Sequence, residues 1–322
     1  MTKLAKKLAE QVQDNAGREV FLEAVIAGLA QEQKTLPTSY LYDARGSELF
    51  EEITELDEYY QTRTEVDILN NCAREWAASL QPGTLLVEFG SGSSIKTEIL
   101  LSQAETIAAY APIDVSPAAL AGAQERLARR FPELEIVPIV GDFQTSTLPR
   151  AFARSPHAGF FPGSTIGNWT PDQAKDLLRA FAKILGRGSQ LLIGIDLSKD
   201  AERLVAAYDD AKGVTAAFNL NLLTRINREL GADFDLSRFQ HLARYNTQLQ
   251  RIEMHLVSLA EQTVTIAGRT FTLVKDETIH TENSYKYTVE KFRLLVSAAG
   301  WQPTEVWTDA DSLFSVHALI AE

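Results

Sequence analysis

The sequence predicts an α/β fold with a mainly parallel sheet, joined to a second domain of α+β type. Three observations support this prediction. Short runs of almost wholly apolar residues recur from residue 84 onward, and helical patterns separate them. After Asp196 the pattern changes, and apolar and polar residues alternate over long stretches. A chain of 322 residues is also long enough for two domains of ordinary size.

The first part of the chain is predicted to be helical and then to alternate between strands and helices. Residues 1–35 contain few helix breakers, and a helix is expected at 65–79. Five apolar runs are typical of strands buried on both faces: 84–89, 107–114, 134–140, 158–163 and 189–196. Helical patterns separate them at 96–103, 117–130 and 172–185. Strands that alternate with helices imply right-handed crossovers and hence a parallel sheet.

The second architecture begins after Asp196. Residues 199–230 are predicted to be helical, and residues 240–274 to form an antiparallel meander with a turn at Ala267-Gly268. The α/β part then resumes with a helix at 287–299 and two last strands at 305–309 and 313–321. The simplest assembly is an α/β domain with an insertion. The predicted domains are 63–198 with 287–322, and 1–62 with 199–286.

The charge balance argues against nucleic acid and membrane partners. The chain has 31 Lys and Arg residues and 43 Asp and Glu residues, so its net charge is −12. A net negative charge repels anionic polymers and anionic lipid surfaces. No apolar run reaches the length of a membrane span, and the N-terminus has no apolar signal segment. The single cysteine, Cys72, excludes an internal disulfide and fits a reducing compartment. We therefore expect a cytoplasmic protein, and a monomer.

A glycine-containing loop is the first chemical signal. Gly90 and Gly92 follow the apolar run 84–89 and precede a predicted helix. Glycines at this place let the backbone approach a ligand, and the helix N-terminus offers N–H groups to an anion. Ile95 stands near the place of the third glycine of a dinucleotide fingerprint, which argues against a nicotinamide or flavin cofactor.

Acidic residues end the next two predicted strands. Asp114 lies 24 residues after Gly90, where a carboxylate can accept both hydroxyls of a ribose. Asp142 and Phe143 follow the third strand, where the carboxylate can accept from an adenine amino group and the ring can stack on adenine. The three strand ends together predict a site for an adenosine-bearing ligand. The alternative interpretation is a turn glycine, a capping aspartate and a core phenylalanine.

These motifs resemble those of the class I S-adenosylmethionine-dependent methyltransferases. Four longer motifs resemble a narrower family, the L-histidine Nα-methyltransferases of ergothioneine biosynthesis. They are Y-D-A-x-G-S-x-L-F (42–50), E-Y-Y-x-T-R-T-E (58–65), G-S-T-I-G-N (163–168) and A-Y-D-D-x-x-G-V-T-A-A-F-N (207–219). The resemblance extends from about residue 35 to the C-terminus.

The resemblance implies the fold, the reaction and the cofactor. The expected fold is a Rossmann-like methyltransferase core, with a C-terminal antiparallel hairpin, plus a substrate-binding domain built from the N-terminus and the insertion. The expected reaction methylates the α-amino group of free histidine three times, giving hercynine. The cofactor is S-adenosylmethionine, and the cofactor-binding positions are Gly90, Lys96, Asp114, Asp142 and Phe143. No metal takes part, and the five histidines show no metal-ligand spacing.

The resemblance also assigns the amino-acid substrate to particular side chains. The contacts of the amino acid itself fall on Tyr59, Asn168 and Tyr208, with Tyr42 nearby, and Tyr42 and Asn168 are the candidate catalytic residues. The imidazole contacts fall on Glu282 and Ser284, within the run T-E-N-S-Y-K-Y (281–287). This run departs from the family pattern at Asn283, Tyr285 and Tyr287, which bears on the width of the pocket.

Other interpretations stay open at this stage. A relative that acts on another amino acid, such as a tryptophan derivative, is the nearest, although Glu282 favours an imidazole over an indole. A protein that binds the cofactor without catalysis is a second. Asn168 could instead cap the helix predicted at 172–185, although Thr170 is the better N-cap.

Overall fold

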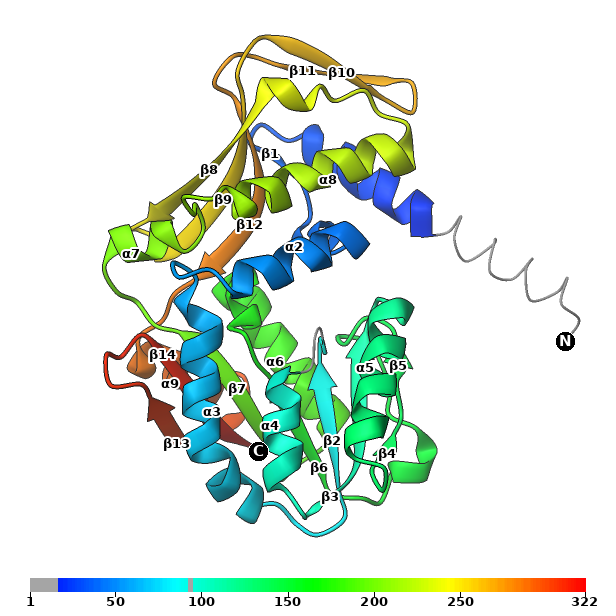
Figure 1. Ribbon diagram of the computed structural model, residues 1–322, viewed down its shortest axis with the longest axis vertical. Helices are drawn as coiled ribbons and strands as arrows, with labels where there is room; N and C mark the ends of the chain where they lie inside the picture. The colour runs from blue at the N-terminus through cyan, green and yellow to red at the C-terminus, as the bar shows by residue number, and fades with distance from the viewer. Residues whose placement is uncertain (1–16, 92–94) are drawn as a thin grey trace, which may run out of the picture. The chain divides into compact units, whose positions relative to one another are not determined.

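The computed structural model describes residues 17–91 and 95–322, and these divide into two compact units (Figure 1). The first unit contains the described residues up to Tyr59 together with Asp200–Asn283. The second unit contains Tyr60–Lys199 and Ser284–Glu322. Each unit therefore combines segments that are far apart in the sequence.

An eight-stranded sheet forms the centre of the second unit. Its strands run in the order β13-β14-β7-β6-β2-β3-β4, and β5 also pairs with β3. The bounds are β2 (Thr84–Phe89), β3 (Ile107–Asp114), β4 (Glu135–Ile136), β5 (Ile139–Val140), β6 (His157–Phe161), β7 (Gln190–Asp196), β13 (Trp301–Thr308) and β14 (Phe314–Ala321). β2, β3, β6 and β7 pair in parallel, whereas β14 is antiparallel to both β7 and β13. The prediction of a mainly parallel sheet with a C-terminal antiparallel hairpin is confirmed.

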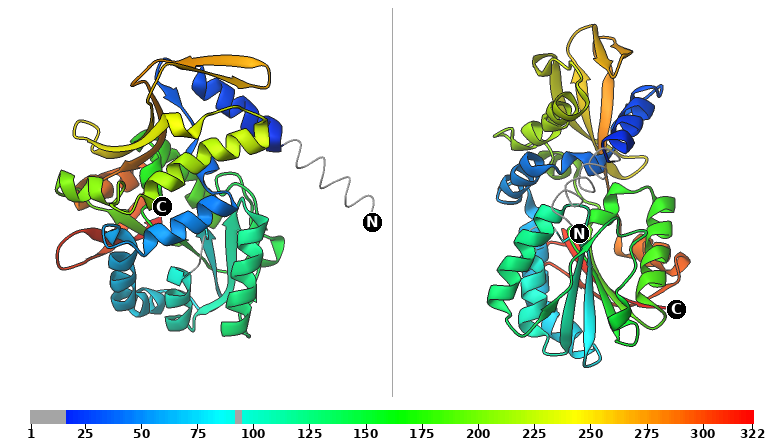
Figure 2. Two further views of the ribbon diagram at one scale, coloured as in Figure 1. Left: turned by 45° about the horizontal axis from the view of Figure 1, so that its top comes forward. Right: turned by 90° about the vertical axis from the view of Figure 1, so that its right-hand side faces the viewer.

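Helices cover both faces of this sheet (Figure 2). Their bounds are α3 (Tyr60–Ala78), α4 (Ile95–Gln103), α5 (Pro117–Arg130), α6 (Pro171–Leu185) and α9 (Val289–Ala298). One core packs Phe89 and Phe161 against Phe181 of α6 and Phe292 of α9. The other core packs Leu86 among residues of α3, α4 and α5. Successive residues of β2 thus enter opposite cores, which explains why the strand is apolar throughout.

The third predicted strand differs from the structure. The run 134–140 was expected to be one strand, but it forms β4 and β5 with a break between them. Val137 still donates its N–H to the carbonyl of Tyr110 at 2.8 Å. Pro138 has no N–H to give to the ladder, so pairing stops and resumes only at Ile139. The prediction of a continuous strand is wrong here.

The first unit is built around a four-stranded sheet with the order β1-β12-β9-β8. The strands are β1 (Lys34–Thr35), β8 (Phe239–Asn246), β9 (Arg251–Ser258) and β12 (Thr278–Tyr285). Residues 17–29 are helical, and the other helices are α2 (Ala44–Thr54), α7 (Ala201–Ala206) and α8 (Val214–Leu230). Short 3-10 helices occur at η1 (Thr38–Leu41) and η4 (Leu236–Arg238).

The insertion differs from its prediction in two places. The helical stretch 199–230 is interrupted, because α7 ends at Ala206 and α8 starts only after Gly213, whose φ is +74°. The predicted meander is two hairpins: β8 pairs with β9, while β10 (Gln262–Ile266) and β11 (Arg269–Leu273) form a sheet of their own. The turn at Ala267-Gly268 is confirmed, with φ of 48° and 78° as in a type I′ hairpin turn.

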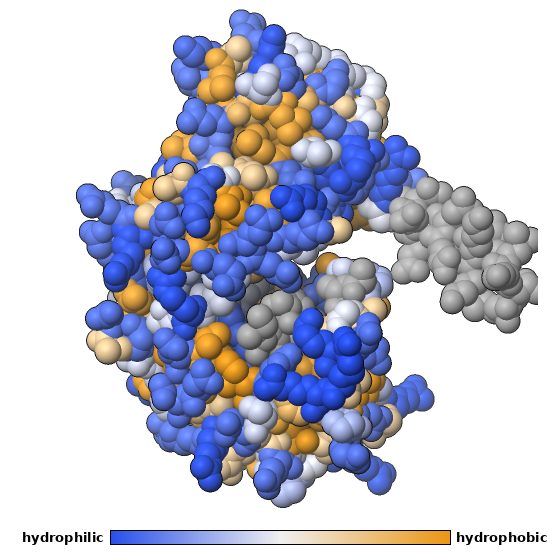
Figure 3. Space-filling model, in the orientation of Figure 1, coloured by the Kyte–Doolittle hydropathy of each residue, from blue (hydrophilic) through white to orange (hydrophobic). Residues whose placement is uncertain are grey.

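Hydrophilic and apolar residues are interspersed over the face drawn in Figure 3. Among the described helices, none is long and apolar enough to cross a bilayer.

Candidate active site

The predicted cofactor residues lie at neighbouring strand ends in the second unit. Gly90 donates its N–H to the carbonyl of Ile113 at 2.9 Å, and Gly141 donates to that of Asp114 at 3.0 Å. Gly90 has a φ of +81°, and a Cβ added there would lie 3.8 Å from the ring of Phe143. The left-handed backbone at Gly90 is the reason for a glycine at this position. Gly92 lies outside the described residues.

Two carboxylates at this edge are oriented by their own loops. Asp114 accepts a hydrogen bond at Oδ1 from the N–H of Ser116 at 2.9 Å. Asp142 accepts at Oδ1 from the N–H of Gln144 at 2.8 Å. An ionised carboxylate has about four acceptor positions, so each retains capacity for a ligand hydroxyl or amine. This edge of the sheet therefore carries a glycine in the backbone, two carboxylates and the half-buried ring of Phe143. These features fit the ribose and the adenine of an adenosine-bearing cofactor.

Lys96, also predicted to bind the cofactor, is held by a carboxylate that sequence analysis missed. Its Nζ donates to Oε2 of Glu65 at 2.5 Å. Glu65 is fully buried and also accepts from the N–H of Gly163, at 3.0 and 2.9 Å to its two oxygens. Glu65 belongs to the motif at 58–65, yet the sequence assigned it no role. The ion pair fixes Lys96 beside the loop that follows β6.

Glu88 is a second missed carboxylate. It is buried in β2 and accepts hydrogen bonds from the hydroxyls of Thr97, at 2.6 Å, and Tyr110. Burial raises the pKa of Glu88 to about 7, although both hydroxyls and Lys96 act in the opposite direction. The signal was visible in the sequence, because Glu88 is the one charged residue in the apolar run 84–89.

Asn168 lies at the end of a 3-10 helix, η3 (Thr165–Asn168), after strand β6. It does not cap α6, because the Thr170 side chain accepts from the N–H of Gln173 and completes a capping box. The preceding residue, Gly167, packs against the end of β12. A Cβ on Gly167 would lie 2.9 Å from the carbonyl oxygen of Tyr285 and 3.5 Å from Oγ of Ser284. The structure therefore brings the loop that carries Asn168 next to Ser284.

Ser284 is linked to a buried cluster of charges. Lys286 Nζ donates to Ser284 Oγ at 2.6 Å and to Oδ2 of Asp196 at 2.6 Å. Asp196 also receives Nζ of Lys199, at 2.5 Å, and the hydroxyl of Tyr60, at 2.8 Å, on its Oδ1. Burial raises the pKa of Asp196, but the two lysines lower it more, so the net pKa lies below its ordinary value. Burial lowers the pKa of Lys199 to about 8.

In the first unit, the motif at 42–50 places Tyr42 at the start of α2. Asp43 is the N-cap of this helix and accepts from the N–H of Gly46 at 2.8 Å. Gly46 is required because a Cβ there would lie 1.8 Å from the carbonyl oxygen of Leu41. Tyr42 packs edge-on against Phe218, with ring centroids 5.4 Å apart.

Tyr59 and Tyr208 lie together in the same unit, with ring centroids 6.2 Å apart. Tyr208 follows α7, and its carbonyl oxygen bonds Nε2 of His241 at 2.8 Å. Asp210 then caps α8 by accepting from the N–H groups of Val214 and Thr215, at 3.0 and 2.8 Å. The motif at 207–219 thus fixes the chain on both sides of Tyr208.

The pKa of Tyr42 is raised well above its ordinary value. Tyr42 is 37% exposed as a whole, but removal of its hydroxyl from solvent is the main cause of the shift, and the charges of Glu282, Tyr59 and Tyr208 raise the pKa further. These four groups of the first unit therefore lie close enough to interact. At neutral pH Tyr42 stays a neutral hydroxyl, which can donate or relay a proton but cannot serve as a phenolate base.

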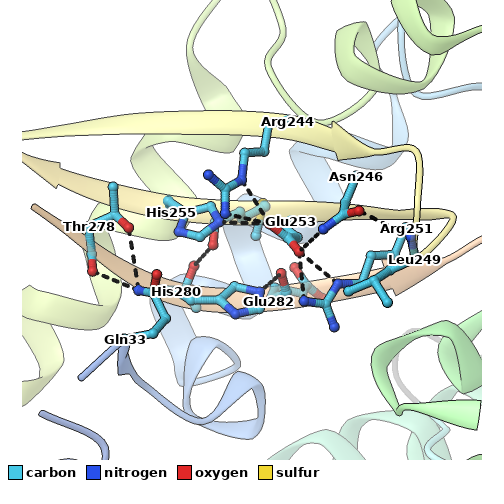
Figure 4. Close-up of polar contacts among 12 residues, drawn as sticks. Gln33, Arg244, Asn246, Leu249, Arg251, Glu253, His255, Thr278, His280 and Glu282 are labelled. Atoms are coloured by element: carbon cyan, nitrogen blue, oxygen red, sulfur yellow. Dashed lines mark hydrogen bonds and ion pairs between the residues drawn. The ribbon is translucent and has the colours of Figure 1, made fainter. Parts of the chain in front are cut away.

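Glu282 lies on a polar face of the four-stranded sheet (Figure 4). A buried carboxylate on the next strand, Glu253, lies near it. Arg251, Arg244 and Asn246 donate to Glu253 at 2.6, 2.7 and 3.0 Å. Burial raises the pKa of Glu253, but these donors outweigh it and lower the pKa to about 2. Sequence analysis did not identify this cluster, because it forms only when β8, which carries Arg244 and Asn246, pairs with β9, which carries Arg251 and Glu253.

Two histidines continue the same face. His255 and His280 stack, with ring centroids 4.7 Å apart and planes at 18°. Nε2 of His280 bonds the carbonyl oxygen of Glu282 at 2.9 Å, and Nε2 of His255 lies 3.3 Å from Oε2 of Glu253. Burial lowers the pKa of His255 to about 4 and also lowers that of His280. The stack is therefore neutral at neutral pH and supports the strand that carries Glu282.

The part of the chain covered by residues 17–91 and 95–322 contains no group of three His, Cys, Asp or Glu side chains arranged to hold a metal ion.

Comparison with known proteins gives a consistent result. The family model "Histidine-specific methyltransferase, SAM-dependent" matches residues 21–321, where SAM is S-adenosylmethionine. Histidine N-alpha-methyltransferase of Mycolicibacterium smegmatis is 42% identical over 94% of this chain and 95% of its own length. Ergothioneine biosynthesis protein 1 of Neurospora crassa is 30% identical over 89% of this chain, which corresponds to 33% of that longer protein.

A further relative has another amino acid in its name. L-tryptophan methyltransferase trpM of Psilocybe serbica is 29% identical over 92% of each chain. The family model matches almost the whole sequence described above, and the relative of highest identity among these three carries histidine in its name. The chain is a methyltransferase that belongs to the family of histidine-specific, SAM-dependent methyltransferases.

Proposed function

We propose that this enzyme transfers three methyl groups from S-adenosylmethionine to the α-amino group of L-histidine, giving hercynine in an early step of ergothioneine biosynthesis. The observation that carries the proposal is the pair Glu282 and Ser284. They stand two residues apart on β12, so their side chains leave the strand on one face, and both are nearly buried. A carboxylate and a hydroxyl at this spacing suit the two ring nitrogens of an imidazole.

The strand ends of the second unit are proposed to hold the cofactor. Asp114 would accept hydrogen bonds from the ribose hydroxyls, and Asp142 would accept one from the adenine amino group. Phe143 would cover the adenine ring, and the glycine at position 90 would let the backbone approach the cofactor closely. Lys96, fixed by Glu65, would attract the carboxylate of the amino-acid moiety. When bound, S-adenosylmethionine supplies an electrophilic methyl group on a sulfonium centre.

The tyrosines are proposed to bind the amino acid without adding charge. The hydroxyls of Tyr59 and Tyr208 would donate to the substrate carboxylate, and the amide oxygen of Asn168 would accept from the amine and orient its lone pair. The α-amino group must be neutral to attack. The α-amino group of a peptide has a reference pKa of about 7.7–8.0, and that of a free amino acid is somewhat higher. A fraction of the amine is therefore neutral at mildly alkaline pH, and a strong base is unnecessary. Tyr42 would relay the released proton to solvent.

Incubation of the purified chain with S-adenosylmethionine and each of the twenty amino acids tests this proposal. Mass spectrometry should show histidine with one, two and three added methyl groups and the other amino acids unchanged. Equal methylation of tryptophan would reject the histidine assignment. Cofactor binding by calorimetry without methylation of any amino acid would reject the catalytic role.

We further propose that the enzyme acts as a monomer in the cytoplasm. The lone cysteine, Cys72, is buried in α3 and has its pKa raised to about 12 by burial, so it is a poor candidate for an intermolecular disulfide. Light scattering should give a mass near 35.6 kDa. A mass twice as large would reject the monomer.

A further inference from the structure

We propose that Asn221 and Arg225, on helix α8, are positioning residues that hold Tyr42 at its place in the active site. This inference rests on the proposed function, in which the Tyr42 hydroxyl relays the proton released from the amine. Both residues lie beyond the end of the motif at 207–219, and neither was among the residues predicted from the sequence to form the site.

Four side chains lie on one face of α8. Phe218, Asn221, Arg225 and Arg228 follow one another at intervals of three, four and three residues, which places them on a single side of the helix. Each of them contacts the chain within residues 40–43. This is the side on which α8 packs against α2 in the first unit (Figure 1). One helix face therefore determines where the chain around Tyr42 lies.

The carboxylate of Asp43 joins the start of α2 to this face. Its Oδ1 accepts from the N–H of Gly46 at 2.8 Å and from Nδ2 of Asn221 at 2.7 Å, and its Oδ2 accepts from Arg228 at 2.7 Å. Burial raises the pKa of Asp43, but these donors outweigh it and lower the pKa, so the group is ionised at neutral pH. Asn221 is buried, whereas Arg228 is exposed. Asn221 is therefore the donor from α8 that water competes with least.

Arg225 holds the chain on the other side of Tyr42. Its Nη1 donates to the carbonyl oxygen of Tyr40 at 2.9 Å. Its guanidinium carbon lies 5.1 and 5.4 Å from the ring centroids of Phe21 and Tyr40. The ring of Tyr42 packs edge-on against Phe218, which belongs to the same helix face. Tyr42 is thus held through the residue two before it, through the residue after it and through its own ring.

The proposed relay depends on the position of the Tyr42 hydroxyl. Its pKa is raised well above the ordinary value, so the group stays neutral and passes a proton on by accepting that of the amine as it gives its own to solvent. This transfer requires a distance of about 2.6–3.2 Å between the hydroxyl and the amine. The hydroxyl lies at the far end of the ring, so a small shift of the backbone moves it out of reach. Loss of the contacts from α8 should therefore slow methyl transfer without weakening cofactor binding.

Asn221→Leu tests the proposal, because leucine has the same branching and the same number of non-hydrogen atoms but no donor for Asp43. In the full chain, kcat for histidine methylation should fall about tenfold or more. The Kd for S-adenosylmethionine should stay within about twofold, since the proposed cofactor residues belong to the second unit. Steady-state kinetics and calorimetry measure the two quantities. An unchanged kcat would overturn the proposal.

Asn227→Leu is the matched control. Asn227 lies on the same helix, and its side chain exchanges two hydrogen bonds with the backbone of Phe234, at 2.8 and 2.9 Å. The same substitution there should lower the stability and leave kcat within about twofold. An equal fall of kcat in both variants would overturn the proposal, because loss of either asparagine of the helix would then suffice.

A double-mutant cycle with Tyr42→Phe separates positioning from a general structural effect. Phenylalanine keeps a ring against Phe218 but has no hydroxyl to place. The effect of Asn221→Leu on kcat should therefore fall below about twofold in the Tyr42→Phe background. A tenfold effect that persists in this background would overturn the proposal.

Arg225→Met provides a second test if Asn221→Leu does not fold, as judged by the absence of a cooperative transition in urea. This change removes the donor to the carbonyl of Tyr40. We expect kcat to fall about tenfold when Tyr42 is present and less than about twofold in Tyr42→Phe. A kcat within twofold of that of the unmodified protein would overturn the proposal.

The outcomes also separate this inference from the proposed function. Absence of histidine methylation in the unmodified protein rejects the proposed function. Normal methylation, with a kcat that depends on the Tyr42 hydroxyl but not on Asn221 or Arg225, rejects only the positioning role. Full kcat in Tyr42→Phe rejects the relay and the positioning role together and leaves the methylation of histidine unaffected.

Discussion

Glu282 and Ser284 are 8% and 4% exposed, although each carries a polar head group. A buried polar group without partners costs about 1–3 kcal/mol, and an uncompensated charge costs more. For Ser284 this cost is offset by Lys286, which Asp196 in turn neutralises. At the residue scale, the site consists of binding side chains and of buried charges that hold them, such as Glu65 beneath Lys96.

Glu282→Ala should remove the preference for histidine while keeping the cofactor site intact. The imidazole N–H would lose its acceptor, and a hydrogen bond to a charged group contributes about 1.5–3 kcal/mol. We expect the KM for histidine to rise about ten- to hundredfold, with the Kd for S-adenosylmethionine unchanged.

Steady-state kinetics and calorimetry measure the two quantities. Glu261→Ala is a suitable control, because this exposed residue precedes β10 and lies outside the sheet that carries Glu282. An unchanged KM for histidine in Glu282→Ala would show that the imidazole binds elsewhere.

At the scale of elements, the site depends on close contact between η3 and the end of β12. Gly167 makes this contact possible, since a Cβ would meet both the N and the O of Tyr285, at 3.2 and 2.9 Å. Backbone atoms in a strand cannot move as a flexible side chain can. The element that carries Asn168 is therefore positioned by a glycine and not by a side-chain interaction.

Gly167→Ala should push η3 away from β12. Overpacking of this kind costs about 1–3 kcal/mol, and the shift of Asn168 should lower kcat/KM for histidine about tenfold or more. Urea unfolding and kinetics measure the two effects.

Gly122→Ala provides the comparison, because nothing lies within 4 Å of a Cβ in the middle of α5. Helix propensity predicts a gain of about 0.5–1 kcal/mol for this change and no effect on kinetics. A Gly167→Ala variant with unchanged stability and activity would show that η3 and β12 do not pack as closely as proposed.

At the scale of the whole molecule, stability is predicted to depend on pH through Glu88. Its folded pKa of about 7 lies above the ordinary value of 4.5, so the folded state favours the protonated acid. The stability contributed by Glu88 is complete below about pH 4.5 and is lost as the pH rises to about 7. The shift corresponds to at most about 3 kcal/mol.

Glu88→Gln should remove this loss, because an amide keeps an oxygen that can accept from Thr97 and Tyr110 without ionising. The Tm of the variant should exceed that of the unmodified protein at pH 8 by several degrees and equal it near pH 5. Calorimetric scans at the two pH values measure the difference. The same difference at both pH values would show that Glu88 does not titrate in this range.

The sequence by itself determined the fold class and where most of the parallel strands lie along the chain, whereas the order of the strands in the sheet came from the structure. The reason is that an apolar run such as 84–89 is a local property, and burial on both faces requires it. Local chemistry also predicted the turn at Ala267-Gly268 and the N-cap at Thr170. The prediction of one strand at 134–140 was wrong because Pro138 interrupts pairing with β3, and this effect depends on the neighbouring strand.

Only the tertiary structure decided which side chains support the site. Lys286 and Asp196 are 90 residues apart, and Glu65 and Gly163 are 98 apart, so no local pattern joins them. Buried polar and charged groups form hydrogen bonds and ion pairs with the groups that the fold brings within about 3 Å of them. The residues proposed to contact the cofactor and the substrate were predicted from the sequence. The buried charged residues that hold these side chains in place were identified only from the tertiary structure.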